Sequence, residues 1–231
     1  MKRHFDEDLK SLNTDLLKMA TLAEEAIYKS IESLKNRDKA LAQKVIDEDR
    51  IIDELELSVE EKAINLLALR QPMAIDLRFI TTAMKVNSEI ERIADLAVNI
   101  CQRTLDVIDQ PLLKPLVDIP KLSAIAQKMV KDSIDAFVKR DKALAKSVIP
   151  LDAQADELRN LIYGELVKEY MCKDAQCAPR AVPLLLIARH LERICDHATY
   201  LAEDVIYMVQ AKVVKHHPEQ LNENNGENAN K

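Results

Sequence analysis

The chain of 231 residues carries 33 Lys and Arg against 39 Asp and Glu, which gives a formal net charge of -6 at pH 7. This acidic balance argues against a nucleic-acid-binding protein, because contacts to phosphate need a concentrated basic face. With only two glycines, no tryptophan and 3% aromatic residues, the composition is typical of an almost entirely helical chain and excludes a β-rich fold. We expect a soluble, cytoplasmic protein, since no charged-then-apolar leader is seen and the apolar run at 181–188 is far shorter than the roughly 20 residues that span a bilayer.

Three long helices are predicted in the first half of the chain. Apolar residues recur at three- and four-residue steps over 5–34 and form one stripe of a first helix. A second helical stretch covers about 37–69, where Arg-Gln-Pro at 70–72 ends it, and a third covers about 74–109. Such long helices with narrow apolar stripes are typical of antiparallel helices packed side by side.

The second half of the chain repeats the first. Residues 30–55 align without a gap on residues 133–158, and the Glu-Arg-Ile-x-Asp motif at 91–95 recurs at 192–196. Three prolines between residues 109 and 120 mark the junction. A repeat of about 100 residues is too long for a solenoid unit and fits a duplicated three-helix bundle.

The sequence therefore predicts an all-α chain of two tandem three-helix bundles, at 1–112 and 113–215. The segment 216–231 is polar and lacks any apolar period, so we expect a disordered tail there.

Pairs of acidic residues four positions apart recur at matched places in the two halves. Because residues at i and i+4 share a helix face, each pair lies beside the apolar stripe, at the edge of the core. Converging carboxylates repel one another unless they are protonated or neutralised, and their oxygens favour hard cations such as Mg²⁺, Mn²⁺, Ca²⁺ or iron. The matched pairs therefore predict a divalent or trivalent metal site in each half, built from Asp49, Asp53, Glu91 and Asp95 and from Asp152, Asp156, Glu192 and Asp196.

A purely structural role for these acids is the main alternative. Acidic residues four apart are common on solvated helix faces, and Asp49 and Asp152 could cap helices, since Pro150 predicts a break or kink just before Asp152.

Catalysis finds little support in the sequence. No glutamate is followed three positions later by histidine, as in di-iron bundle enzymes, and neither a glycine-rich phosphate loop nor a nucleophile elbow is present. We expect a protein that is not an enzyme, and a metal-dependent phosphohydrolase is the less favoured alternative.

The two Glu-Arg-Ile-x-Asp motifs, the stretch Arg-Gln-Pro-Met-Ala-Ile-Asp-Leu-Arg at 70–78 and the segment 37–49 together resemble the PhoU family. The resemblance covers roughly residues 1–214. It implies two three-helix bundles related by a pseudo-twofold axis, with multinuclear metal sites at the (E/D)xxxD motifs. In this chain those motifs fall on the eight acids named above.

The resemblance also implies a function. A PhoU-like protein is a negative regulator of high-affinity phosphate uptake and of the phosphate-responsive two-component system. It contacts the ATPase subunit of the phosphate ABC transporter and the sensor histidine kinase, and it meets the membrane only through these partners. We also expect a homodimer. The second half lacks a counterpart of Asp-Leu-Arg at 76–78, so Asp76 and Arg78 are candidate partner contacts, unless they form a salt bridge that fastens the third helix.

Overall fold

The computed structural model describes the backbone of residues 2–211 and the side chains of residues 4–211. The predicted tail at 216–231 lies outside the described residues. Within the described part the chain is helical and has no strand, which confirms the all-α prediction. The elements are α1 Lys2–Asn36, α2 Lys39–Arg70, α3 Ala74–Val107, α4 Asp118–Lys139, α5 Lys142–Val148, α6 Leu151–Glu165, the π-helical η1 Leu166–Met171, the 3₁₀-helical η2 Ala175–Cys177, and α7 Ala178–Gln210.

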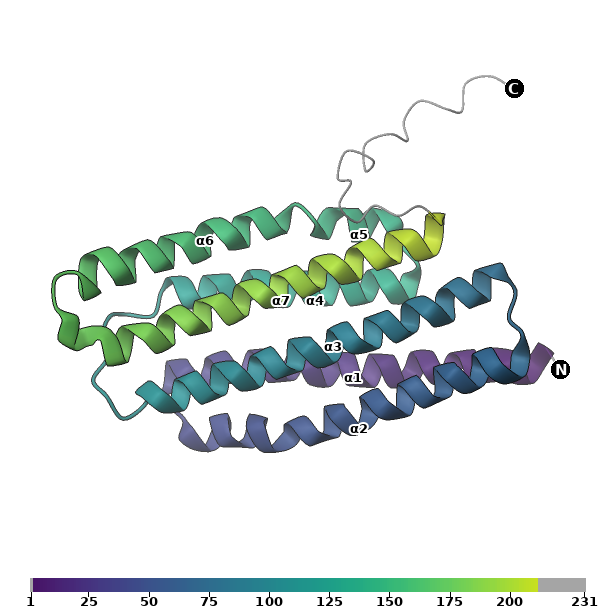
Figure 1. Ribbon diagram of the computed structural model, residues 1–231, viewed down its shortest axis with the longest axis horizontal. Helices are drawn as coiled ribbons and strands as arrows, with labels where there is room; N and C mark the ends of the chain where they lie inside the picture. Colours follow the sequence, from purple (N-terminus) through teal and green to yellow (C-terminus); the bar gives the residue numbers. More distant parts are fainter. Residues whose placement is uncertain (1, 212–231) are drawn as a thin grey trace, which may run out of the picture.

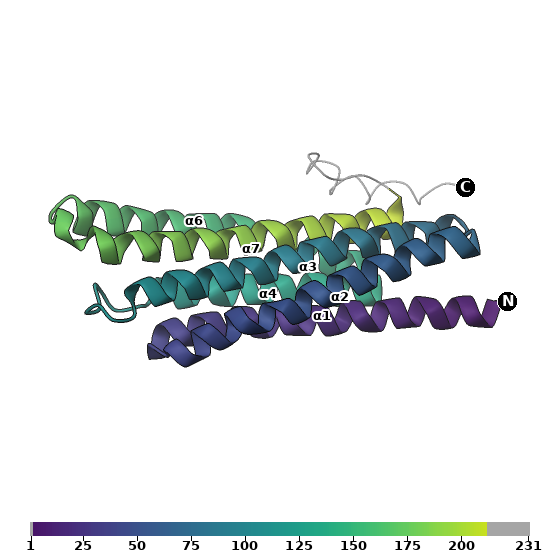
Figure 2. The ribbon, with the colours of Figure 1, turned by 60° about the horizontal axis from the view of Figure 1, so that its bottom comes forward.

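The helices lie side by side along one long axis, and each long helix runs antiparallel to the one before it (Figures 1 and 2). Helices α1, α2 and α3 form the first bundle, and α4, the broken helix α5–α6, and α7 form the second, which confirms the two predicted bundles. Helix α3 packs more extensively against α7 than any other two elements pack together. No helix in the described part is both long and apolar enough to cross a membrane.

The two bundles share one hydrophobic core. A single cluster of buried side chains includes Leu16 and Ile90 of the first bundle with Ile134 and Ile194 of the second. The predicted boundary at residues 112 and 113 falls in the connection between α3 and α4, yet apolar packing is continuous from one bundle to the other. Burying one shared core removes more apolar surface from water than two separate bundles would.

Matched aspartates begin the second helix of each bundle. The Asp38 carboxylate accepts a hydrogen bond of 2.9 Å from the backbone N–H of Leu41 at the start of α2. Its twin Asp141 accepts hydrogen bonds from the N–H groups of two residues at the start of α5. These side chains satisfy donors that a helix N-terminus leaves free. By contrast, Asp49 lies inside α2 and Asp152 lies in the first turn of α6 after Pro150, so the prediction that these two cap helices is wrong.

Pro150 interrupts the second bundle as predicted. Helix α5 ends at Val148 and α6 begins at Leu151, because proline lacks a backbone donor and its ring clashes with the preceding turn. The twin position in the first half is Asp47, and there α2 continues unbroken. This one difference explains why α2 corresponds to the two segments α5 and α6.

Candidate metal centre

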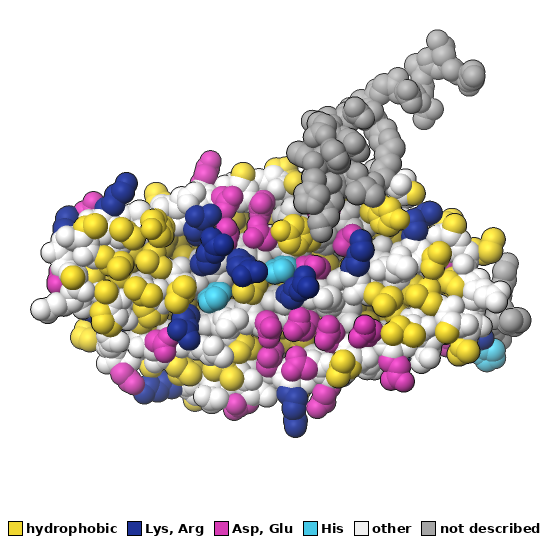
Figure 3. Space-filling model, in the orientation of Figure 1, with side chains coloured by type: hydrophobic (Ala, Val, Ile, Leu, Met, Phe, Trp, Pro, Cys, Tyr) yellow, Lys and Arg dark blue, Asp and Glu magenta, His cyan; other side chains and the backbone are white. Residues whose placement is uncertain are grey.

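The four predicted acids of the first bundle meet across the α2–α3 interface. Asp49 and Glu91 are half-buried, whereas Asp53 and Asp95 are more exposed. The pKa of Asp49 is raised to about 6, mainly by burial and to a smaller extent by the negative charges of Asp53 and Asp95. Burial and then Asp95 raise the pKa of Glu91 to about 7, with a contribution from Asp53. The carboxylates therefore repel one another, as the sequence predicts, and acidic side chains gather over the middle of α2 and α3 (Figure 3).

A fifth carboxylate, which the sequence analysis did not single out, belongs to this cluster. Glu56 raises the pKa of Glu91, and its own pKa is raised by burial and by Glu60 and Asp53. The amide of Asn87, which is 2% exposed, donates a hydrogen bond of 2.9 Å to the Glu56 carbonyl and so holds α2 against α3 here. The three- and four-residue steps from Asp53 to Glu56 to Glu60 are the signal that could have identified it.

The predicted acids of the second bundle meet between α6 and α7. Burial and then Asp196, Asp156 and Glu192 raise the pKa of Asp152 to about 6. Burial raises the pKa of Glu192 and of Asp196 as well, and neighbouring acids add to both increases. All eight predicted residues thus lie in two clusters, four in each bundle.

Arg159 makes the second cluster different from the first. Its Nη2 atom lies 3.2 Å from Asp156 Oδ1 and 3.2 Å from Glu192 Oε1, so one guanidinium bridges the two helices. The residue at the twin position of the first half is Glu56. A cation is therefore built into the second cluster at the place where the first carries one more anion. In the first cluster Arg92 lowers the pKa of Glu91, but burial and the neighbouring acids raise it by more.

The side chains do not form a finished coordination sphere. Across the described residues, no three Asp, Glu, His or Cys side chains converge closely enough to hold a metal ion. The donor chemistry does fit a hard cation, because the ligands are carboxylate oxygens on facing helices and Glu192 Oε2 is buried without a hydrogen-bond partner. Metal binding by these acids stays a prediction that requires side-chain movement.

The other two candidate residues lie at the opposite end of α3 from the interbundle connection. Asp76 is in the first turn of α3, and the structure records no ion pair for Asp76 or Arg78 with any side chain of residues 4–211. The alternative in which the two form a fastening salt bridge therefore lacks support. Beside them, Leu69, Met73 and Ile75 are 73%, 79% and 62% exposed.

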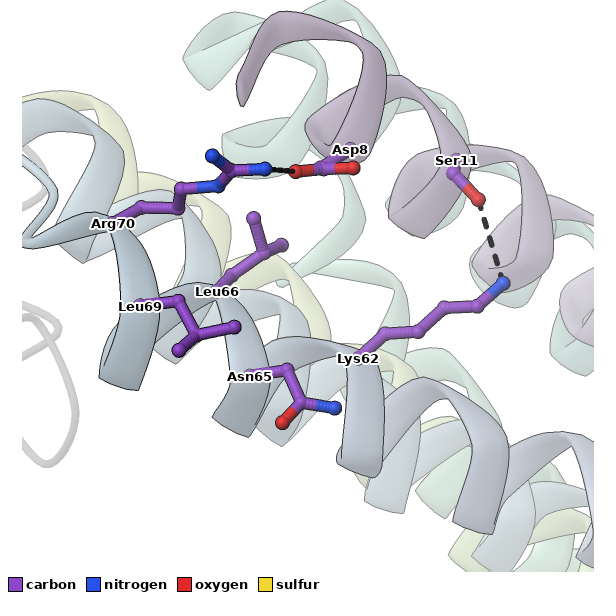
Figure 4. Close-up of a pocket in the computed structure, with 7 residues that line it drawn as sticks. All are labelled: Asp8, Ser11, Lys62, Asn65, Leu66, Leu69 and Arg70. Atoms are coloured by element: carbon purple, nitrogen blue, oxygen red, sulfur yellow. Dashed lines mark hydrogen bonds and ion pairs between the residues drawn. The ribbon is translucent and has the colours of Figure 1, made fainter. Parts of the chain in front are cut away.

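A pocket of about 400 Å³ opens between α1 and α2 near this end (Figure 4). Its two cationic side chains already have anionic partners within the chain. Arg70 Nη2 lies 2.8 Å from Asp8 Oδ2, and Lys62 pairs with Asp15. Because these charges are neutralised, we assign no anion site to the pocket.

Comparison with known proteins agrees with the duplicated architecture. The family model of the PhoU domain matches twice, over residues 16–104 and 119–205. The chain belongs to the PhoU family. The two matched segments coincide with the two bundles, so each bundle is one PhoU domain.

PhoU relatives and PhoU structures cover most of the chain. The phosphate-specific transport system accessory protein PhoU homolog of Aquifex aeolicus is 41% identical over 210 residues, which are 91% of this chain and 95% of that protein. The corresponding homolog of Rhizobium meliloti is 37% identical over 88% of this chain and 86% of its own length. The crystal structure of PhoU from Pseudomonas aeruginosa matches with a TM-score of 0.87 at 33% identity, covering 90% of this chain and all of that one. PhoU from Streptococcus pneumoniae matches with a TM-score of 0.84 at 27% identity, covering 91% of this chain and 99% of the other.

Proposed function

We propose that this chain is an accessory protein of phosphate-specific transport that negatively regulates high-affinity phosphate uptake and the phosphate-responsive two-component system. The observation that carries the proposal is the match of the PhoU domain to both bundles. Relatives that share 41% and 37% of their residues over most of the chain are named as accessory proteins of this transport system. A helical chain without a recognisable nucleophile or phosphate loop suits an adaptor better than an enzyme.

The partners we propose are the ATPase subunit of the phosphate ABC transporter and the sensor histidine kinase, reached from the cytoplasm by a homodimer of this chain. The end of the first bundle supports a contact surface. Asp76 and Arg78 lie there beside the exposed apolar side chains Leu69, Met73 and Ile75. Grouped apolar side chains at a surface, with polar residues around them, mark interaction sites in proteins.

We further propose that the two acidic clusters hold metal ions. A divalent or trivalent cation would neutralise the carboxylates of Asp49, Asp53, Glu91 and Asp95 in the first bundle and of Asp152, Asp156, Glu192 and Asp196 in the second. The raised pKa values of Asp49, Glu91 and Asp152 support the proposal, because they show repulsion that a cation would relieve. A metal-free adaptor, in which only protonation and Arg159 relieve this repulsion, is the alternative.

The regulatory proposal is tested in a strain of the source organism that lacks the gene. Without it, a reporter of the two-component system should stay active at high phosphate, and the full chain should restore repression. An Asp76→Lys/Arg78→Glu variant should restore repression less well than the wild type. A control that makes the same kinds of change on the exposed face of α2, Glu61→Lys/Arg50→Glu, should restore it fully. Repression that never depends on the gene would refute the proposal.

The metal proposal is tested by elemental analysis of protein purified without a histidine tag. The wild type should contain stoichiometric metal that is lost in the Glu91→Ala/Asp95→Ala/Glu192→Ala/Asp196→Ala variant, while circular dichroism shows that the variant is still helical. Equal metal content in both proteins would favour the metal-free adaptor. Hydrolysis of a panel of phosphoesters that depends on added metal and is abolished by Glu91→Ala would instead favour the phosphohydrolase.

A further inference from the structure

A groove on the second bundle has no assigned role. It lies between α6 and the N-terminal half of α7 and encloses about 320 Å³. Tyr163, Val182 and Leu186 are 56%, 40% and 37% exposed, so large apolar side chains face water here. Figure 3 shows apolar side chains gathered over this end of α6 and α7. We call it the α6–α7 groove, and its lining residues are Arg159, Tyr163, Val182, Leu185, Leu186, Ala188 and Arg189.

The first bundle does not share this surface. Under the internal repeat, the twin of Tyr163 is Glu60 and the twin of Leu186 is Lys85. The twin of Arg189 is Ser88. The two bundles share their buried framework, and Arg193 has a basic twin in Arg92, but the exposed apolar side chains of this surface occur only in the second bundle. The packing of a PhoU domain therefore does not require these exposed apolar residues.

Basic side chains gather beside the groove. Arg189 and Arg193 are exposed on α7, one turn apart. The pKa of His190 is lowered by burial and then by Arg103, Arg193 and Arg189, so three guanidinium groups lie around this imidazole. Figure 3 shows Lys, Arg and His side chains over the middle of α7. Arg189 Nε lies 3.9 Å from Glu192 Oε2, which is beyond hydrogen-bonding distance, and the structure records no ion pair of Arg193 with a side chain of residues 4–211. These exposed guanidinium groups can therefore still pair with carboxylates of an acidic partner.

The apolar and basic residues form one row along α7. Val182, Leu186, Arg189 and Arg193 follow one another at steps of four, three and four residues, so they share a helix face over about 16 Å. We propose that the α6–α7 groove binds an amphipathic α-helix of a partner protein, with apolar side chains against Val182, Leu186 and Tyr163 and carboxylates against Arg189 and Arg193.

A helix suits the groove better than an extended segment. The groove is bounded by two antiparallel helices, and the backbone N–H and C=O groups of each are already hydrogen-bonded within that helix. An extended peptide gains affinity by pairing with free backbone groups at a sheet edge, and helices offer none. A third helix instead packs its apolar row between the side chains of two neighbouring helices.

This inference rests on the proposed function, which names the transporter ATPase and the sensor kinase as partners. The test measures binding of the full chain to each purified partner. A Leu186→Asp/Arg189→Glu variant should bind one of them about 10- to 100-fold more weakly, because it removes an apolar contact and reverses a charge. The control Leu57→Asp/Arg50→Glu makes the same two changes on exposed positions of α2 and should bind like the wild type.

A photo-cross-linking residue at Tyr163, which is 56% exposed, locates the bound segment. Peptide mapping should place the cross-link in a helical segment of the partner that carries apolar residues and, one or two turns away, Asp or Glu. Replacing those acids by Lys should restore binding to the groove variant.

The outcomes separate the groove from the proposed function. If the wild type binds a partner and the groove variant binds equally well, the groove inference is wrong while the proposed function stands. A cross-link only to a second copy of the chain would also overturn it and assign the groove to self-association. If the wild type binds neither partner, the proposed adaptor function fails, and the inference fails with it.

Discussion

The clearest physical consequence of the first acidic cluster is that neutralising Glu91 should stabilise the metal-free protein. Burial and neighbouring acids raise its pKa from the ordinary 4.5 to about 7, so the folded state favours the protonated carboxyl. A pKa change of one corresponds to about 1.36 kcal/mol, so ionised Glu91 would lower the free energy of unfolding by about 3 kcal/mol without solvent screening. Because this side chain is only half-buried, screening reduces the effect to about 1 to 2 kcal/mol.

The sign of the pH dependence follows from the direction of this change. A carboxyl with a raised pKa in the folded state contributes its full stability below about pH 4.5 and loses it as the pH rises to about 7. The Glu91→Gln variant keeps the shape of the side chain and removes the charge. It should therefore match the wild type near pH 4 and exceed it above pH 7.

The assay is thermal unfolding followed by circular dichroism, in a chelator so that no metal contributes. At pH 8 the Glu91→Gln variant should unfold about 2 to 8 °C above the wild type. Glu61→Gln, on the exposed face of α2, is the control and should change the unfolding temperature by less than about 1 °C at either pH. A Glu91→Gln variant that matches the wild type at pH 4 but is less stable than it at pH 8 would refute the reasoning, because it would show that the ionised carboxylate makes a favourable contact.

The expected stabilities of four further variants can be checked by denaturant unfolding. Arg159→Glu should lower the free energy of unfolding by about 1 to 3 kcal/mol, because it removes the bridge to Asp156 and Glu192 and adds a like charge. Glu56→Arg should raise the free energy of unfolding by about 1 kcal/mol or less, because it replaces one of the crowded carboxylates by a cation. Asp141→Ala should cost about 1 kcal/mol through loss of the α5 N-cap. Phe137→Ala should cost about 3 to 5 kcal/mol, because Phe137 is 2% exposed and stacks on a phenylalanine of the other bundle at 5.5 Å between ring centroids.

The bounds of the first three helices could be predicted closely from sequence, because local chemistry sets them. Asp38 supplies the N-cap of α2, and α2 ends where Gln71 adopts a left-handed conformation just before Pro72. In the second bundle, Pro150 is a local signal that predicts the break before α6. These signals act over a few residues, so a single sequence is enough to identify them.

The packing of the two bundles into one shared hydrophobic core could not be predicted from local signals. On α3, three- and four-residue steps of apolar residues such as Ile90 and Ile93 predict one buried face of the helix. In the structure Ala94 and Leu96 are buried too, at 1% and 7% exposure, and α3 packs against α1, α2 and α7. Apolar residues on two faces of a helix show that it has several neighbours, but they do not identify which helix covers each face.

The candidate metal centre was predictable in part. The i and i+4 spacing placed each acidic pair correctly, and the repeat placed the pairs on neighbouring helices. The charge difference between the twin positions Glu56 and Arg159 was missed, because an alignment of the two halves draws attention to the positions that match and not to those whose charge differs. The contact between His197 Nδ1 and Glu89 Oε2, at 2.5 Å across the α3–α7 interface, depends on the fusion of the bundles and so had no sequence signal.

Duplication explains how one chain can carry two different surfaces on one framework. Each bundle keeps the same caps and the same acidic pairs, since these positions shape the domain. Outside this framework the first bundle carries Glu56 and Glu60 where the second carries Arg159 and Tyr163. Arg159 supplies an internal cation to the second acidic cluster, and Tyr163 adds an exposed aromatic ring to the lining of the α6–α7 groove. These replacements stand at two twin positions one helical turn apart, so we expect the second cluster, which already has its own positive charge, to depend less on an added cation than the first.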